Sequence, residues 1–200
     1  MLTDHTKSII AVLRTFMGKP VLVSLHVDRR DWSRCSVGFV DDVSKTHVRL
    51  LAVDPAGKLA GYEVRSIAEV FRVDVAGGYE RRLEASLRKR GDFSPGSAPR
   101  GRGLIESTLR KAKSARAIVT IWGSDPDDSL VGFVEELKQG AVSVQVISSS
   151  GRPDGRSWIS LNEVISVDAD TTAERKLLAL HMKNEKKPRS KQLRSSVRVA

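Results

Sequence analysis

The chain has 200 residues, a net charge of +10, 40% hydrophobic and 29% charged residues, a composition typical of a globular protein. No apolar run approaches the roughly 18 residues of a transmembrane helix, and the first residues lack the basic start and small-residue cleavage site of a signal peptide. Cys35 is the only cysteine and the four histidines lack zinc-site spacing, so we expect a reduced, cytoplasmic protein without disulfide, metal or cofactor.

The sequence contains one segment twice. Residues 38–74 align with residues 132–168 at a constant offset of 94 without a gap, and eleven of the 37 aligned pairs are identical. Upstream, residues 21–26 match residues 117–122 at an offset of 96. A repeat of this length that keeps its hydrophobic residues in phase predicts two copies of one small domain.

Both copies predict the same elements in the same order. Apolar residues at helical spacing predict a helix that begins near residue 9, matched by a shorter, more exposed helix from residue 104. Alternating apolar residues then predict three strands in each copy. In the first copy these strands are 21–27, 36–43 and 47–53, and in the second they are 117–122, 130–137 and 141–147. A glycine in each second strand predicts a strong bend.

A pattern of period two that changes to period three closes each copy. In the second copy it comprises Ile159, Leu161, Val164 and Val167. The change of period predicts a short strand, one tight helical turn and a final strand. We therefore expect a mostly β fold of two tandem, closed five-stranded barrels with short flanking helices.

The predicted organisation has four parts. The first barrel with its helices spans residues 1–90, a flexible linker spans 91–103, the second barrel spans 104–183, and a basic, disordered tail spans 184–200. We expect the two barrels to be independent of one another.

The order of elements resembles that of the Sm-like proteins, the group that includes bacterial Hfq. Gly38, Val40 and Val43, followed by an apolar strand, are similar to the first Sm signature, and Ile159-x-Leu161-x-x-Val164 is similar to the second. The resemblance covers roughly residues 9–75 and 105–169 and implies small five-stranded barrels and RNA binding. Ser44 and Lys138 stand where the family has an aspartate, so the family's RNA contacts are not carried over.

The positive charge is concentrated outside the predicted barrels. Residues 81–116 hold 11 basic and 3 acidic side chains, residues 174–200 hold 9 and 2, and residues 117–173 hold 3 and 9. Basic blocks of this kind are typical of phosphate-binding arms or of solvated surface segments. The candidate phosphate contacts are Arg88, Lys89, Arg90, Arg100, Arg102, Lys183, Lys186, Lys187, Arg189 and Lys191.

Trp32 is the candidate base-stacking residue, because Arg29, Arg30 and Arg34 surround it. Trp122 and Trp158 lie in predicted strands and are expected in the core. Asp125, Asp127 and Asp128 belong to a segment rich in Asp and Pro, for which a turn is favoured over a cation site.

These features predict a nucleic-acid-associated regulatory protein that binds RNA. We expect it to be non-enzymatic, because the sequence has no nucleophile–base pair, phosphate loop or metal-site spacing. One alternative is an interaction module that binds other proteins. Self-association is compatible with either interpretation. The other is a barrel that senses cyclic dinucleotides, since Arg30-x-x-x-Arg34 is similar to part of the PilZ pattern.

Overall fold

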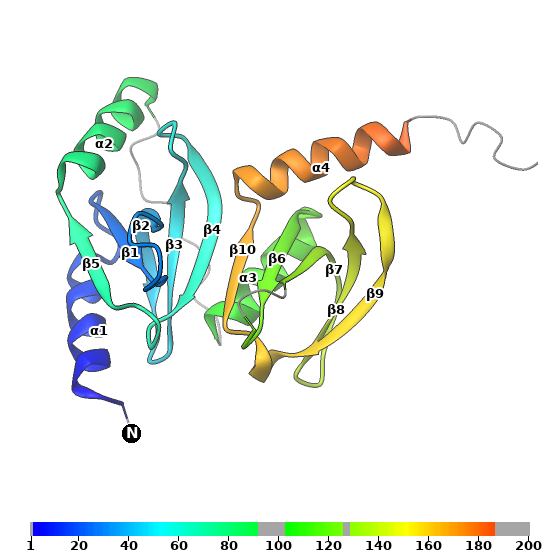
Figure 1. The fold of residues 1–200 in the computed structure, drawn as a ribbon, viewed down its shortest axis with the longest axis horizontal. Coiled ribbons are helices and arrows are strands. Elements are labelled where there is room, and N and C mark those ends of the chain that lie inside the picture. Colours follow the sequence, from blue (N-terminus) through cyan, green and yellow to red (C-terminus); the bar gives the residue numbers. More distant parts are fainter. Residues whose placement is uncertain (1, 92–102, 126–128, 187–200) are drawn as a thin grey trace, which may run out of the picture.

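The structure is a computed structural model that describes residues 2–91, 103–125 and 129–186. Over these ranges it is mostly β, with four α-helices and ten strands that follow the same order in both halves (Figure 1). The first half comprises α1 (Asp4–Phe16), β1 (Leu22–His26), β2 (Ser36–Val43), β3 (His47–Val53), β4 (Leu59–Ser66), β5 (Arg72–Val75) and α2 (Gly78–Arg90). The second comprises α3 (Leu104–Ala115), β6 (Ile118–Trp122), β7 (Ser129–Lys138), β8 (Ala141–Ile147), β9 (Pro153–Ser160), the 3-10 turn η1 (Leu161–Glu163), β10 (Ser166–Ala169) and α4 (Thr172–Glu185).

The prediction of two closed, independent barrels is wrong. All ten strands form one antiparallel sheet in the order β5-β1-β2-β3-β4-β10-β6-β7-β8-β9. β4 of the first half pairs with β10 of the second, in the register Val167↔Val64 and Asp168↔Glu63, instead of closing onto β5 (Figure 1). An open half-sheet presents unpaired backbone donors and acceptors at both edges, and pairing between the halves satisfies one edge of each.

A glycine lets the second and third strands of each half approach closely. A Cβ atom on Gly38 would lie 2.3 Å from the carbonyl oxygen of Leu51, and one on Gly132 would lie 2.0 Å from that of Gln145. The register shifts two residues later, between Val40 and Asp42 and at the equivalent place in the second half. The sharp curvature predicted for this position therefore comes from a close contact together with a bulge.

Each half has its own core, and the core of the second half extends across the junction between β10 and β4. Leu13, Leu25 and Leu50 lie in the first core, and Leu109, Ile121 and Val144 lie at equivalent places in the second. Val64 of β4 is fully buried, and it belongs to the core of the second half. The halves are therefore joined by side-chain packing as well as by backbone pairing.

The helices that follow the final strand of each half, α2 after β5 and α4 after β10, are held by equivalent hydrogen bonds. The Ser24 hydroxyl donates a hydrogen bond to Glu80, and in the second half Thr120 Oγ1 donates to Glu174 Oε1 over 2.6 Å. Both glutamates are buried, and Glu174 also completes a capping box with Thr171. The repeat therefore extends beyond its last identical pair into α2 and α4.

A buried ionic network spans the junction. Arg65 on β4 donates to Asp168 on β10 and, over 2.9 Å, to Glu63, while its Nε donates to Ser36 Oγ over 2.8 Å. The Arg65 side chain is only 11% exposed. Burial opposes its charge, but the two carboxylates outweigh burial and raise the pKa of the guanidinium. The Arg65 guanidinium thus pairs with the carboxylates of both Asp168 and Glu63 in a largely buried site.

This arrangement makes the stability of the junction depend on pH. Burial, followed by the nearby charge of Glu63, raises the pKa of Asp168 to about 7 against the attraction of Arg65. Between pH 3.8, the ordinary pKa of the group, and about 7, folded Asp168 keeps a proton that the unfolded chain has lost. Its contribution therefore favours the folded state at acid pH and falls as pH rises through this window, by up to about 1.4 kcal/mol per pH unit.

We expect Asp168→Asn to remove the part of the pH dependence of the free energy of unfolding that Asp168 causes. The measurement is the free energy of unfolding in urea at several pH values from acid to neutral for both proteins. Other groups contribute equally to both curves, so the difference between them isolates Asp168. Parallel curves would contradict a raised pKa at this site.

Among the described residues, the helices are all too short or too polar to cross a membrane.

Candidate nucleic-acid interface

The loop between β1 and β2 holds an exposed tryptophan in a defined position. Trp32 is 61% exposed, and its Nε1 donates a hydrogen bond to the Arg29 carbonyl oxygen over 3.1 Å. Its ring centroid lies 5.4 Å from that of Phe71 at an interplanar angle of 50°. The guanidinium of Arg29 lies 4.9 Å from the Phe71 ring centroid. We name Arg29, Trp32 and Phe71 the aromatic platform.

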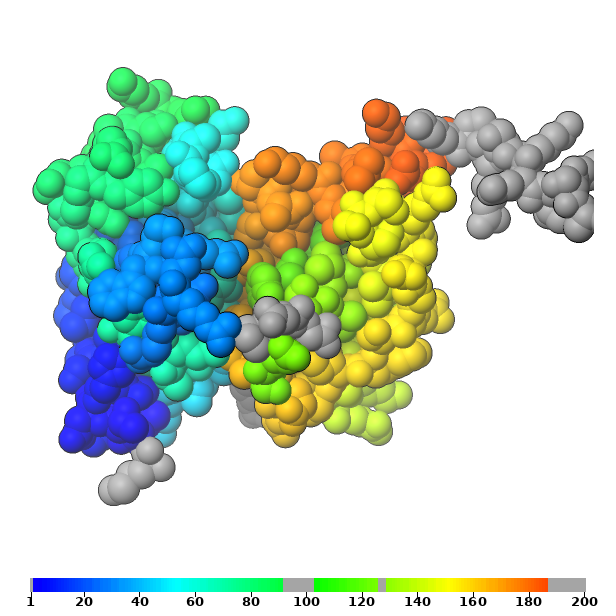
Figure 2. All heavy atoms as spheres, viewed as in Figure 1, coloured from blue at the N-terminus to red at the C-terminus, as the bar shows by residue number. Residues whose placement is uncertain are grey.

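Hydrogen bonds from backbone N–H groups to aspartate side chains stabilise the conformation of this loop. Asp28 Oδ1 accepts hydrogen bonds from the backbone N–H groups of Arg30 and Asp31, and Asp31 Oδ1 accepts from that of Ser33. Aspartate turns of this kind fix a loop without regular secondary structure. The hydrogen bonds from Ser33 also lower the pKa of Asp31. The loop forms a protrusion, coloured mid-blue, on the face seen in Figure 2.

An open groove of about 1030 Å³ begins beside this loop and follows β5 to the start of α2. Ser33 and Arg34 line it at the loop, and Arg72 and Tyr79 line it further along. Much of its positive charge is paired, since Arg72 Nη2 lies 2.7 Å from Asp74 and Arg34 Nη1 lies 3.9 Å from Asp28. Arg29 of the platform and its neighbour Arg30 are exposed cations.

The predicted phosphate contacts that the structure describes lie at the ends of two helices. Arg88, Lys89 and Arg90 form the exposed last turn of α2. Lys183 lies in the exposed last turn of α4, and Lys186 caps that helix. Both helices lie at the same end of the molecule, on different halves of the sheet (Figure 1). The other five candidates, Arg100, Arg102, Lys187, Arg189 and Lys191, lie outside the described residues.

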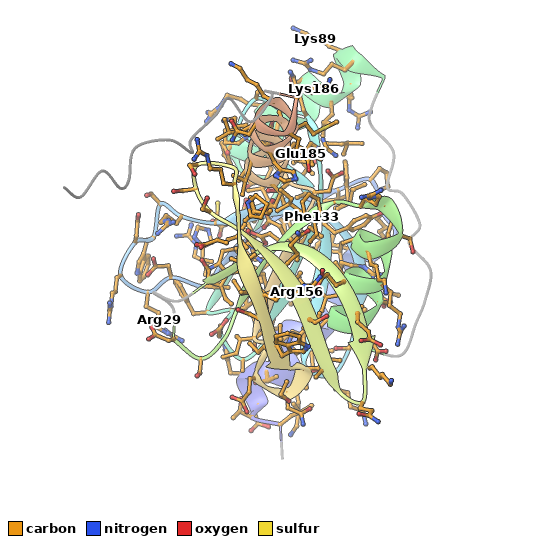
Figure 3. The ribbon with its side chains drawn as sticks, turned by 90° about the vertical axis from the view of Figure 1, so that its right-hand side faces the viewer. Arg29, Lys89, Phe133, Arg156, Glu185 and Lys186 are labelled. Atoms are coloured by element: carbon orange, nitrogen blue, oxygen red, sulfur yellow. The ribbon has the colours of Figure 1, made fainter. Side chains whose placement is uncertain are left out.

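The structure does not bring Trp32 together with the basic helix ends. Figure 3 shows Lys89 and Lys186 at one end of the molecule and Arg29 well away from both. Any nucleic acid that contacts the platform and a helix end must therefore extend along the surface between them. The predicted residues form three separate contact points rather than one site.

Two aromatic residues differ from their sequence-based interpretation. Trp158 was expected in the core, but it is 70% exposed on the outer strand β9, so that expectation is wrong. Phe71 was not recognised as part of a site. Its counterpart in the second copy is Ile165, so an aromatic residue that replaces an aliphatic one between copies was the available signal. Trp32 likewise has no aromatic counterpart in the second copy.

Comparison of the chain with protein-family models, with curated proteins and with solved structures finds no significant match. Within residues 2–91, 103–125 and 129–186, no three His, Cys, Asp or Glu side chains are placed to share a metal ion.

Proposed function

We propose that this protein is a non-enzymatic, cytoplasmic regulatory protein that binds single-stranded nucleic acid, RNA in particular. The observation that carries the proposal is the aromatic platform. An exposed indole normally moves freely, but Trp32 is held by a hydrogen bond to Arg29 and by the ring of Phe71. An immobilised, exposed aromatic face beside cations is the arrangement on which unpaired bases stack.

The distribution of charge supports binding through the first half of the sheet and the helix ends. Arg29 belongs to the platform and Arg30 follows it in the sequence, while the excess of acidic side chains in residues 117–173 of the second copy repels a polyanion. Phosphate contacts of this type are indifferent to sequence and weaken with salt, with a slope of about −0.7 per contact for a single strand. Stacking supplies about 1–3 kcal/mol per base. The binding affinity should therefore have a salt-sensitive contribution from the cations and a salt-insensitive contribution from Trp32.

We expect Trp32→Ala to weaken binding of a labelled single-stranded RNA about 5- to 150-fold, the equivalent of one lost stacking contact. Trp32→Phe should retain much of the affinity, because a phenyl ring still offers a stacking face. A duplex of the same sequence should bind more weakly than the single strand and should be insensitive to Trp32→Ala, since its bases are already stacked. Fluorescence anisotropy at two salt concentrations measures all of these affinities.

Charge reversal at the platform supplies the second arm of the same experiment. Arg29→Glu together with Arg30→Glu should reduce the salt slope, whereas the matched control Arg152→Glu, on an exposed turn of the acidic copy, should change little. Absence of binding by the intact chain at low salt would rule out the proposed function. Unchanged affinity of Trp32→Ala would instead show that the binding site does not include the platform.

A further inference from the structure

The groove along β5 has an exposed aromatic side chain at each end. Trp32 stands at its beginning, next to Ser33 and Arg34, which line it, and Tyr79, 36% exposed, lines it at the start of α2. β5 leads directly into α2 (Figure 1). The groove volume of about 1030 Å³ matches the upper limit of the roughly 300–1,000 Å³ of ligand sites. A ligand that extends from one aromatic residue to the other therefore has room in it.

Tyr79 is held in place as the platform residues are. The next residue, Glu80, is buried and accepts a hydrogen bond from the Ser24 hydroxyl, which fixes the first turn of α2 against β1. The Arg82 guanidinium lies 5.7 Å from the Tyr79 ring centroid, and an arginine lies over an aromatic ring in the platform too. Burial raises the pKa of the Tyr79 phenol, so the ring is neutral at neutral pH. Tyr79 is thus a fixed, partly exposed aromatic face beside a cation.

Arg72 lies in the groove between these two ends. Its Nε donates a hydrogen bond to Asp74 Oδ1 over 2.7 Å, and its Nη2 lies 2.7 Å from Asp74 Oδ2. His26 Nε2 lies 3.1 Å from the same carboxylate. The hydrogen bonds between Arg72 and Asp74 raise the pKa of the arginine and lower that of the aspartate. The guanidinium is therefore charged and fixed in orientation, with its third nitrogen, Nη1, able to donate to a ligand.

The cations of the groove are more exposed than its carboxylates. Two arginines and two acidic residues line it. The side chains of Arg34 and Arg72 are 76% and 47% exposed, whereas Asp74 is 32% exposed and Glu80 is buried. The surface that a ligand meets is therefore cationic, although the formal charges balance. A cationic groove of this kind follows the phosphates of a single strand.

The second copy lacks the side chains that give the groove this character. At the offset of 94, Ala173 stands in place of Tyr79 and Ser166 in place of Arg72. The second copy nevertheless forms the equivalent strand β10 and the equivalent helix α4. The fold therefore does not require a tyrosine or an arginine at these positions, and a ligand of the first copy accounts for both.

We propose that the groove binds a second base of the same single strand, with Tyr79 stacking on that base and Arg72 contacting the phosphates that connect it to the base on Trp32. The inference rests on the proposed function and extends it, because the strand then runs along β5 to α2 and away from the acidic second copy. Proteins that bind single strands combine a cationic groove with aromatic side chains on which successive bases stack.

The test of the stacking role compares two substitutions of Tyr79. Tyr79→Ala should weaken binding of a labelled single-stranded RNA about 5- to 150-fold, the equivalent of one lost stacking contact. The equivalent helix α4 has alanine at this position, so the substitution is compatible with the fold. Tyr79→Phe should retain much of the affinity. Trp158→Ala is the control, because Trp158 is 70% exposed on β9 and does not line the groove.

The test of the phosphate contact uses the salt dependence of the same affinities. Arg72→Gln should make the salt slope shallower by about 0.7, the value of one phosphate contact on a single strand. Arg175→Gln is the matched control. Arg175 is 48% exposed and pairs with Asp170 through the same two nitrogens, but it lies on the second half and does not line the groove. Its slope should equal that of the wild type.

The outcomes separate this inference from the proposed function. If Trp32→Ala weakens binding while Tyr79→Ala and Arg72→Gln bind like the wild type, the inference is overturned and the proposed function stands. If Tyr79→Phe loses as much affinity as Tyr79→Ala, Tyr79 does not act by stacking and the inference is likewise overturned. Absence of binding by the intact chain at low salt would overturn both.

Discussion

Replacing Arg65 by methionine is expected to lower the free energy of unfolding by about 3–5 kcal/mol, because it leaves two carboxylates buried without their cation. Asp168 and Glu63 face one another across β10 and β4, and Arg65 contacts both. The loss should be smaller at acid pH, where Asp168 takes up a proton and needs no counter-charge. Urea unfolding at acid and neutral pH measures both effects.

The first half supplies a matched control for this substitution. Asp74 is the repeat counterpart of Asp168, and Arg72 contacts it at 2.7 Å, but the Arg72 side chain is half exposed. An exposed ion pair contributes about 0–1 kcal/mol, so Arg72→Met should cost little. Equal costs at the two positions would show that the network at the junction is not effectively buried, and would contradict the raised pKa of Asp168.

Alanine at Gly132 is expected to destabilise the protein by about 3 kcal/mol or more, and alanine at Gly38 by a similar amount. In both halves the added Cβ atom would lie within 2.3 Å of a backbone carbonyl oxygen of the neighbouring strand. A backbone atom cannot rotate away as a side chain does, so the second and third strands must separate and lose hydrogen bonds. Thermal unfolding of the two single variants measures the cost.

Gly78→Ala is the control for these two substitutions. Gly78 is the first residue of α2, and no described atom lies within 4 Å of its Cβ position. Alanine there should be neutral or stabilise the protein by up to about 1 kcal/mol, since it reduces the freedom of the unfolded chain. A large cost at Gly78, or wild-type stability at Gly132, would contradict the close-contact explanation.

The aromatic platform shows how far a site can be predicted from single residues. Trp32 was identified from its neighbours in sequence, the arginines of the same loop. Phe71 is 39 residues further on, and only the pairing of β1 with β5 brings it beside the loop. The basic residues of α2 and α4 were recognised from composition, but their separation from Trp32 follows from the direction of the helices across the sheet.

The amino-acid sequence by itself determined the repeat, the positions of the strands, and the 3-10 turn at Leu161–Glu163, because each depends on local periodicity or on the comparison of one copy with the other. Only the tertiary structure decided which edges meet. An edge strand pairs through backbone groups that are the same in every residue, so the pattern around Val64 reads alike whether β4 closes onto β5 or pairs with β10. Trp158 was expected in the core because it lies in a strand, but its strand β9 is at the end of the sheet and pairs with β8 alone.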